Sequence, residues 1–447
     1  MSRKRYGTVA SGRPEGPSPS EIEGTAMGSV TASSSTELDE LAWKFLGSEF
    51  AKDVYSDWPL DRRLDAYLRH HRLAGLVNDG VAYGGLLDRV MNNIGAALRG
   101  GVLKRGADAQ ATGLGSDMAQ TEPGEDVIRN AITLACRAPS LHNSQPWRWT
   151  LDGSELHLFA DRTRVLLFTD STGREVLLSC GAVLDHLRVA MAAAGWNTSV
   201  ERFPDPHDPE HVAALKFTPT STVTEAQRDR ANAILMRRTD RLPFDAPPEW
   251  PSVEVRLRLA VIPHHVMTDI VLDRDRPILA EASRLTEQIR SGDPSYQSEL
   301  NWWTPPFALS EGVPQTALVS ESEAGRVDVA RTFPPVPPKE RRRAITADRS
   351  KIIVLSTSHE DARRDVLQCG EALSAVLLEC TLAGFATCTL THMTEIAPSR
   401  DAIRRLLGQT GSPQVLIRIG IAPPTDDQQQ TRATPRRPLT EVLEIRH

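Results

Sequence analysis

Cysteine and long hydrophobic runs are both scarce in this chain, and each shortage excludes a class of protein. Its 447 residues contain five cysteines, and none of them has a CxxC spacing or another spacing typical of metal ligands. A free thiol in an apolar run behaves as a small hydrophobic side chain, so we expect reduced thiols, a cytoplasmic location, no disulfide framework and no metal site. No run of 18 or more apolar residues is present, so we expect no membrane span. The basic residues near the N-terminus are not followed by the apolar stretch of a secretory signal.

An excess of positive charge is also missing. The formal net charge is −6, which argues against nucleic-acid binding, because nucleic-acid-binding proteins carry a basic surface. Hydrophobic residues make up 40% of the chain and charged residues 25%, as in ordinary globular domains. A chain of this length exceeds one hydrophobic core, so we expect two or three folding units.

Composition divides the chain into segments. Residues 1–35 are rich in Ser, Gly, Pro and Thr, which predicts a disordered tail. Apolar residues recur at helical spacing through 36–99, which predicts a small helical module. Residues 100–121 are rich in Gly, Ala and Gln, as linkers are. The main body then consists of a first half, 122–222, and a second half, 223–447.

Two segments of the main body resemble each other. Residues 174–198 read REVLLSCGAVLDHLRVAMAAAGWNT and residues 363–387 read RRDVLQCGEALSAVLLECTLAGFAT, and their Cys-Gly pairs are 189 positions apart. Each segment predicts a long apolar helix that ends before a glycine. We interpret the repeat as two related halves that pack their buried helices together, as a fused homodimer would. The alternative is chance similarity between two Ala- and Leu-rich helices.

Other elements are predicted from periodicity and β-branched runs. Strands are expected at 156–160, 213–217, 352–356 and 415–421, and helices at 225–237, 277–291 and 399–407. Helices and strands alternate along the chain, so the fold class is α+β or α/β.

A dense polar motif occupies residues 139–147, Pro-Ser-Leu-His-Asn-Ser-Gln-Pro-Trp. It lies between an amphipathic helix at 127–137 and a strand that begins at Trp147. So many donors and acceptors at a helix-to-strand junction suit a planar ligand rich in heteroatoms. The alternative is a turn in which Ser and Asn cap their own backbone. For His142 we expect a structural role beside Trp147 rather than catalysis.

Two further motifs are basic. Residues 237–244 read Arg-Arg-Thr-Asp-Arg-Leu-Pro-Phe, and three guanidinium groups beside a hydroxyl favour a phosphate site. The alternative is a helix C-terminus whose cations offset the helix dipole. In residues 434–439, Thr-Pro-Arg-Arg-Pro-Leu, the arginines either complete an anion site or form a solvated tail.

Residues 293–343 form a long insertion that is rich in aromatic residues and proline and has no periodicity of its own. Such loops are usually functional or disordered, and the aromatic side chains argue against disorder. We predict a lid over the ligand site, or an arm that clasps the other half; the two roles are compatible. The basic cluster at 339–343 is expected to be a solvated turn.

These motifs resemble the flavin-dependent nitroreductase family, most closely its Acg-type subgroup. The resemblance rests on PSLHNSQPWRW at 139–149, RRTDRLPF at 237–244, TLAGFATCTLTH at 381–392 and TPRRPL at 434–439, and it covers about residues 121 to 446. It implies an α+β fold in which two subunits build FMN sites at their interface. This chain carries one copy of each site motif. The resemblance therefore implies one FMN per chain, held between two fused halves in a monomer that imitates a dimer.

The resemblance also implies a chemistry and a set of site residues. FMN would be the cofactor, NADPH or NADH the electron donor, and a small nitro- or quinone-like molecule the acceptor, so the flavin carries the chemistry and no side chain is assigned as catalytic. The implied cofactor-binding residues are Pro139, Ser140, Leu141, Asn143 and Gln145 around the ring, Arg237, Arg238, Thr239 and Arg241 at the phosphate and ribityl chain, Thr389, Leu390 and Thr391 near flavin N5, and Arg436 and Arg437 near the phosphate.

One departure from the family pattern concerns the N5 region. Thr391 and His392 stand where many members carry Glu-Gly, so the local electrostatics differ. This departure and the insertion leave an alternative open, namely a protein that sequesters FMN under a lid without turning over NAD(P)H. The N-terminal module lies outside the resemblance and is interpreted as a separate interaction or regulatory domain.

Overall fold

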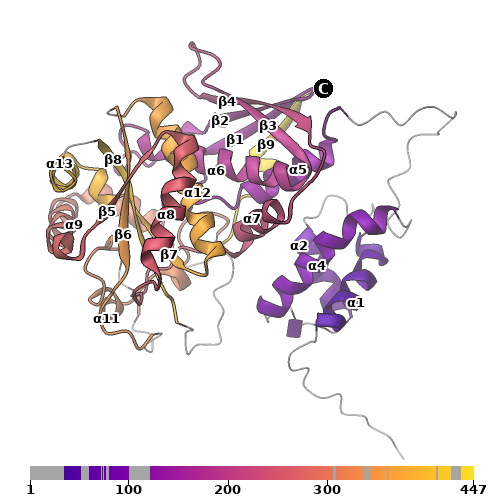
Figure 1. The fold of residues 1–447 in the computed structure, drawn as a ribbon, viewed down its shortest axis with the longest axis horizontal. Helices are drawn as coiled ribbons and strands as arrows, with labels where there is room; N and C mark the ends of the chain where they lie inside the picture. Colours follow the sequence, from indigo (N-terminus) through magenta and orange to yellow (C-terminus); the bar gives the residue numbers. More distant parts are fainter. Residues whose placement is uncertain are drawn as a thin grey trace, which may run out of the picture. The chain divides into compact units, whose positions relative to one another are not determined.

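The computed structural model describes residues 35–51, 60–71, 73, 75–76, 80–99, 121–305, 309–334, 336–337, 343–359, 361–408, 411–423 and 434–446. The chain divides into two compact units, residues 1–110 and 111–447. Both are drawn in Figure 1, and each is described by itself. The segments predicted as a disordered tail and a linker fall outside the described residues, apart from their last residues, Ser35 and Thr121.

The smaller unit is helical. Its helices are α1 (Ser35–Leu46), α2 (Leu60–His70) and α4 (Gly80–Arg99). Their apolar faces meet in a core that includes Phe45, Leu64, Leu68, Leu86 and Val90. The phenyl ring of Phe45 lies edge-on to the ring of Tyr67, with 5.4 Å between centroids. Burial of one apolar stripe per helix is what the helical spacing of these residues predicts.

The larger unit contains two sheets. The first has the strand order β3-β4-β2-β1-β9 and the second has the order β5-β6-β8-β7. The strands are β1 (Trp147–Asp152), β2 (Glu155–Ala160), β3 (Trp196–Arg202), β4 (His211–Pro219), β5 (Met267–Val271), β6 (Lys351–Thr357), β7 (Ala386–Leu390), β8 (Ser412–Gly420) and β9 (Leu443–Arg446). All neighbours are antiparallel except β1 and β9, which are parallel. The last strand of the chain therefore joins the first sheet.

Helices cover and separate the sheets. They are α5 (Glu125–Ala135), α6 (Arg174–Ala193), α7 (Glu225–Met236), α8 (Trp250–Val261), α9 (Arg276–Ser291), α10 (Pro294–Trp302), α11 (Glu321–Ala324), α12 (Arg363–Leu382), α13 (Ala397–Leu406) and α14 (Leu439–Val442). One core joins α6 and α12 to strands of both sheets, and the two helices lie between the sheets in Figure 1. A second core packs α9 and α13 against the other face of the second sheet. The larger unit is thus a layered α+β structure.

The two similar sequence segments form the paired central helices α6 and α12. They meet at equivalent glycines: a Cβ atom added to Gly181 would lie 2.8 Å from the Cα of Gly370 and closer still to the carbonyl oxygen of Leu367. Four residues further on, the Ser374 hydroxyl donates to Asp185 Oδ2 at 2.6 Å. The members of both pairs are 189 positions apart, so the helices cross where the repeat aligns them.

The repeat extends beyond the helices. Read as β1-β2-β4-β3 and β5-β6-β8-β7, the sheets share one strand order and one antiparallel pattern. Each sheet also has a break in register at the corresponding place, between Leu158 and Phe159 in β2 and between Leu355 and Ser356 in β6. A shared irregularity of this kind is a specific feature of a strand. The two halves are therefore built on one plan.

Several elements differ from the sequence-based predictions. The insertion was predicted to lack regular structure, but residues Pro294–Trp302 form helix α10, whose start Asp293 caps by accepting from the amides of Ser295 and Tyr296. Arg343 was assigned to a solvated turn; it is buried and pairs with Asp240, because its charge has a carboxylate partner inside the protein. Residues 306–308, 335 and 338–342 of the insertion lie outside the described residues.

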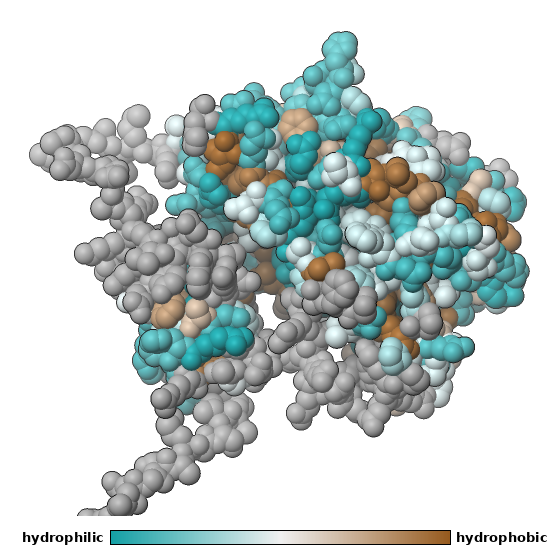
Figure 2. All heavy atoms as spheres, turned by 180° about the vertical axis from the view of Figure 1, so that it is seen from behind, coloured by the Kyte–Doolittle hydropathy of each residue, from teal (hydrophilic) through white to brown (hydrophobic). Residues whose placement is uncertain are grey.

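Helix α6 alone among the described helices is long and apolar enough to cross a membrane. However, 83% of its most apolar stretch is buried inside the protein, so it is explained as a core helix packed on α12. On the larger unit, the face shown in Figure 2 carries separate hydrophobic patches among hydrophilic side chains. Such a mixture is normal for a folded domain.

Candidate functional site

The turn that follows α5 has an unusual backbone. His142, Asn143 and Gln145 have φ angles of 48°, 57° and 51°, a left-handed conformation that is costly for residues with a Cβ atom. Two serine hydroxyl groups stabilise this backbone. The backbone amide of Gln145 donates to Ser140 Oγ at 3.0 Å, and the backbone amide of Leu141 donates to Ser179 Oγ of α6 at 3.3 Å. Left-handed residues that cluster in this way are typical of ligand sites.

The side-chain amides of this turn reach two distant parts of the chain. Asn143 Nδ2 donates to the carbonyl oxygens of Gly312, at 3.1 Å, and of Pro435, at 3.2 Å. Gln145 Nε2 donates to the carbonyl oxygen of Ser310 at 2.9 Å, and Gln145 Oε1 accepts from the backbone amide of Arg437 at 2.9 Å. The turn is thus fastened to the insertion and to the C-terminal segment.

Four arginines lie near one another beside the C-terminal end of α5. Arg436 donates to the carbonyl oxygens of Cys136, at 2.9 Å, and of Arg137, at 3.0 Å. Arg237 donates to the same Arg137 carbonyl at 3.3 Å. Arg238 follows Arg237 and is exposed. We call Arg137, Arg237, Arg238 and Arg436 the arginine cluster.

The charge of the arginine cluster bears on the kind of ligand that it could bind. Among the described residues, no carboxylate forms an ion pair with Arg237, Arg238 or Arg436, whose bonds go to backbone carbonyls. Burial and the charges of Arg238 and Arg137 lower the pKa of Arg237 to about 9, and burial with Arg137 and Arg237 lowers the pKa of Arg436 well below its usual value. Arg237 Nε and Nη1 are buried without a hydrogen-bond partner. Donors in this state suit a phosphate group, which accepts several charge-assisted hydrogen bonds.

His186 of α6 lies near the arginine cluster, and the sequence analysis missed it. Its Nδ1 lies 2.9 Å from the Ala182 carbonyl, which can only accept, so Nδ1 carries the proton and Nε2 is a free acceptor. Burial and the charge of Arg237 lower its pKa to about 3, so the ring is neutral. No sequence pattern marks this residue. Arg137 was also missed, although its place two residues before Pro139 and the polar motif could have revealed it.

The segment after α7 leads away from the cluster toward the second sheet. Thr239 forms a parallel bridge with Thr387, and the Asp240 amide donates to the Thr387 carbonyl at 2.9 Å. Arg241 then reaches the insertion, where its Nη1 donates to the Ala317 carbonyl at 3.2 Å and its guanidinium lies 4.9 Å from the centre of the Phe333 ring. The motif thus runs beside β7, which ends at Leu390.

Thr391 stands where many family members carry a glutamate, but the carboxylate of Glu395 lies beside it. The Thr391 hydroxyl donates to Glu395 Oε1 at 2.8 Å and accepts from Arg331 Nη2 at 3.2 Å. Arg331 comes from the insertion, pairs with Glu395 and donates to the Tyr296 hydroxyl at 2.8 Å. The position that differs from the family pattern is therefore next to a paired carboxylate and guanidinium, neither of which the sequence analysis identified.

Two buried histidines flank this region. His392 Nε2 lies 2.9 Å from the Ser283 hydroxyl of α9, and burial with the charge of Arg331 lowers its pKa well below the usual value. The His142 ring lies edge-on to Phe333 of the insertion, 5.7 Å between centroids. Trp147, predicted as its neighbour, was the wrong aromatic residue, because the left-handed turn points the ring toward the insertion. Both His142 ring nitrogens are buried without a partner.

The structure brings most of the predicted site residues together, but it places Arg437 away from the arginine cluster. Hydrogen bonds link the turn at 139–145 to Pro435 and Arg437, Arg436 to the end of α5, and Thr391 to the insertion. Arg437 points away from the arginine cluster: it donates to the Gln145 and Trp147 carbonyls and pairs with Asp161 at 3.7 Å. It supports the turn. Among the described residues, no group of three or more His, Cys, Asp or Glu side chains could hold a metal ion.

Comparison with known proteins identifies the family. No family model matches the chain. "Putative NAD(P)H nitroreductase acg" from Mycobacterium tuberculosis is 54% identical over 329 residues, which are 74% of this chain and 98% of the relative. The chain belongs to the Acg-type nitroreductases.

Other proteins are also similar to this nitroreductase. "Putative NAD(P)H nitroreductase Rv3131" from the same species is 37% identical over 326 residues, 72% of this chain and 92% of the relative. Among solved structures, the FMN and NADPH-dependent nitroreductase NfnB from sphigopyxis sp. strain HMH is 15% identical with a TM-score of 0.32, covering 49% of this chain and 99% of that one. The sequence resemblance to the family is confirmed by the first relative.

Proposed function

We propose that this nitroreductase binds one FMN per chain and uses it to pass electrons from NADPH or NADH to a small nitro- or quinone-like acceptor, in two half-reactions. The observation that carries the proposal is the arginine cluster at one end of the strained turn, in which Arg237, Arg238 and Arg436 form no ion pair with a carboxylate among the described residues. The phosphate of FMN would supply negative charge beside Arg237 and accept from its unpartnered Nε and Nη1.

The residues present fit the rest of this cofactor. Arg137, Arg237, Arg238 and Arg436 would hold the phosphate, and Pro139, Ser140, Leu141 and Asn143 would line the ring. Asn143 Oδ1 is buried without a partner, so an acceptor is ready for a donor of a bound ligand. When bound, flavin supplies hydride and electron transfer, and the protein supplies orientation and charge.

Two features support a single site in a monomer that imitates a dimer. The halves share one strand order, and their central helices cross at equivalent glycines, as two subunits of a symmetric dimer would. Each site motif occurs once, the polar turn in the first half and Arg237–Arg238 in the second. We further propose that the protein is cytoplasmic, binds neither nucleic acid nor membrane, and carries residues 36–99 as a separate interaction module.

The insertion favours a second candidate function, sequestration of FMN. Ser310 and Gly312 accept hydrogen bonds from Gln145 and Asn143 of the turn, and Phe333 packs on both Arg241 and His142. Arg331 adds a guanidinium beside Thr391. A lid held in so many places would exclude water and also oppose the entry of a nicotinamide. Under this alternative, the protein holds FMN without NAD(P)H turnover.

Anaerobic reduction separates the two functions. Purified protein should be yellow, with a flavin-to-chain ratio near one. Bleaching on addition of NADPH or NADH, reversed by a nitroaromatic compound or a quinone, would support the enzyme. A yellow protein that does not bleach would support sequestration. A colourless protein that shows no heat of binding with added FMN would refute both, and a ratio near two would refute the single site.

A further inference from the structure

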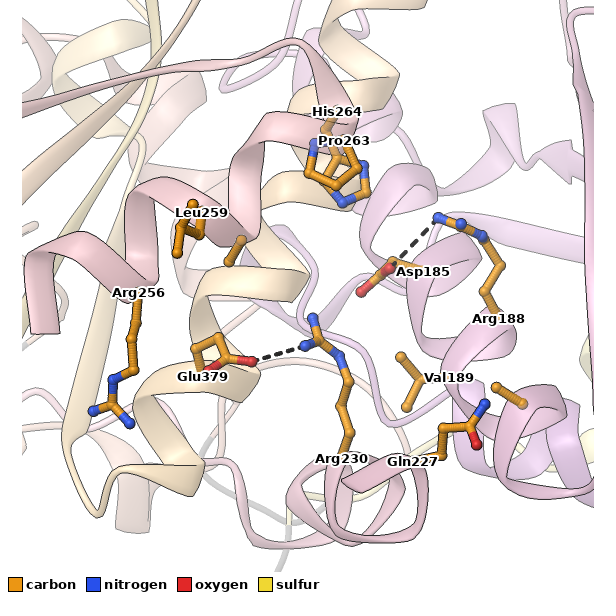
Figure 3. Close-up of a pocket in the computed structure, with 12 residues that line it drawn as sticks. Asp185, Arg188, Val189, Gln227, Arg230, Arg256, Leu259, Pro263, His264 and Glu379 are labelled. Atoms are coloured by element: carbon orange, nitrogen blue, oxygen red, sulfur yellow. Dashed lines mark hydrogen bonds and ion pairs between the residues drawn. The ribbon is translucent and has the colours of Figure 1, made fainter. Parts of the chain in front are cut away.

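A second candidate site lies within the larger unit. A cavity of about 550 Å³ that is open to solvent is lined by α6, α7, α8, α12 and the short turn Ile262–His264, and Figure 3 shows its lining. Its polar wall includes Asp185, Arg188, Gln227, Arg230 and Glu379. The volume is in the range of sites for small organic ligands. None of these residues belongs to the arginine cluster or the turn at 139–145.

The guanidinium group of Arg188 lines the cavity and makes only long contacts with the neighbouring carboxylates. Its Nη1 lies 3.4 Å from Glu371 Oε2 and 3.9 Å from Asp185 Oδ1. Both carboxylates are already engaged: Arg202 donates to both oxygens of Glu371 at 2.7 Å, and the Ser374 hydroxyl donates to Asp185 at 2.6 Å. The Arg188 side chain is 37% exposed, so it can turn its donors to a ligand.

Helix α7 also supplies donors to the cavity. Arg230 donates one hydrogen bond, from Nη1 to Glu379 Oε1 at 2.8 Å, and is 29% exposed. Gln227 Oε1 accepts from the amide and hydroxyl groups of Thr224, so the part of the Gln227 side chain left for a ligand is its NH₂ group. In Figure 3, Arg230 and Arg188 approach the cavity from different helices.

The charges of the lining favour an anion. The lining includes three guanidinium groups, those of Arg188, Arg230 and Arg256, and two carboxylates, those of Asp185 and Glu379. His264 adds no charge at neutral pH, because burial lowers its pKa. The apolar side chains of Val189, Leu259 and Pro263 complete the wall. A ligand rich in acceptors with an apolar body matches this arrangement.

We propose that this cavity binds a small organic anion, with its phosphate or carboxylate group between Arg188 and Arg230 and its apolar body against Val189 and Leu259. The site is separate from the flavin site and does not depend on the proposed redox function. The protein would then bind a small organic anion in addition to FMN.

Calorimetric titration of the full-length, FMN-saturated protein tests this site. The probes are 1-naphthyl phosphate, 1-naphthoate and the uncharged 1-naphthol. We expect saturable binding of at least one anion, at least about tenfold tighter than naphthol, and the better anion shows which head group the arginines prefer. Absence of saturable binding by both anions at about millimolar concentration would overturn the proposal, as would release of flavin during the titration, which would place the anion at the arginine cluster.

Three variants locate the anion. Arg230→Ala should weaken binding about tenfold or more, whereas Arg228→Ala, an exposed arginine of the same helix, should leave it unchanged. Glu379→Gln should tighten binding several-fold, because it removes a carboxylate that repels the ligand; a misfolded variant would not bind more tightly. Equal affinities for Arg230→Ala and Arg228→Ala would overturn the proposal.

Discussion

Gly181 and Gly370 face each other at the crossing of α6 and α12, where a Cβ atom on either would lie within 2.9 Å of the Cα atom of the other. Contacts this short do not occur between real side chains and backbone, so the two helices can approach only because both positions are glycine. The crossing joins the two halves of the larger unit, and the turn at 139–145 is fastened to α6 through Ser179.

Gly181→Ala should therefore destabilise the larger unit. The added methyl group would force the helices apart, and overpacking of a core costs about 1–3 kcal/mol. Urea denaturation followed by circular dichroism would measure the change. The control is Gly292→Ala, where the nearest atom to the added Cβ would be 3.8 Å away, so its stability should change by about 0.5 kcal/mol or less. Equal stability of the two variants would show that the helices can separate freely at this point.

Arg237→Ala should weaken flavin retention. A charge-assisted hydrogen bond contributes about 1.5–3 kcal/mol, so the dissociation constant for FMN should rise about 10- to 100-fold. Arg238→Ala should act in the same direction. Fluorescence titration of flavin-free protein with FMN would measure both. Arg129→Ala removes an exposed arginine of α5 that pairs with Glu125 and should leave the constant unchanged. If all three variants hold FMN equally well, the arginine cluster is not the phosphate site.

Much of the fold was predictable because periodic burial leaves a clear pattern. Strand β8 is buried at all its positions, and its continuous apolar run marked it in advance. The glycines after α6 and α12, Gly195 and Gly384, adopt φ angles of 92° and 76°, as expected for helix ends. By contrast, helix α8 exposes Val255 and Leu259, so its sequence carries no clean amphipathic signal, and it was not predicted.

The candidate site was predictable where its residues are consecutive and unpredictable where the fold brings them together. Arg237 and Asn143 lie in dense local motifs. His186, Arg331 and Glu395 reach the site from isolated positions, and Arg331 becomes visible only through a tertiary contact, its hydrogen bond to the Thr391 hydroxyl. Arg437 is the opposite case, a residue in a dense local motif whose position was not predictable. Its motif suggested an anion site, but its guanidinium group pairs with Asp161 and contacts the turn.

Acid should destabilise the protein through its buried histidines. Burial lowers the folded-state pKa of His186 to about 3, so this ring stays neutral in the folded state, whereas it binds a proton below about pH 6.5 when unfolded. Its contribution is present above that pH and is lost as the pH falls, by up to about 1.4 kcal/mol per pH unit. His186→Gln, which does not titrate, should lose less stability than the wild type between about pH 7 and pH 5.5. Urea denaturation at both pH values measures this difference, and parallel losses would contradict the assignment.

Phe333→Ala should loosen the insertion over the candidate flavin site. The phenyl ring packs on the Arg241 guanidinium and against the His142 ring, so its removal takes away a contact with the turn and a contact with the segment after α7. If the insertion occludes the site, anaerobic bleaching by NADPH should become at least about tenfold faster, equivalent to about 1.4 kcal/mol of barrier. Leu309→Ala changes a side chain of the same insertion that is 43% exposed and should bleach at the wild-type rate. Unchanged bleaching in Phe333→Ala, with flavin fully retained, would mean that the insertion clasps the two halves together and does not control access.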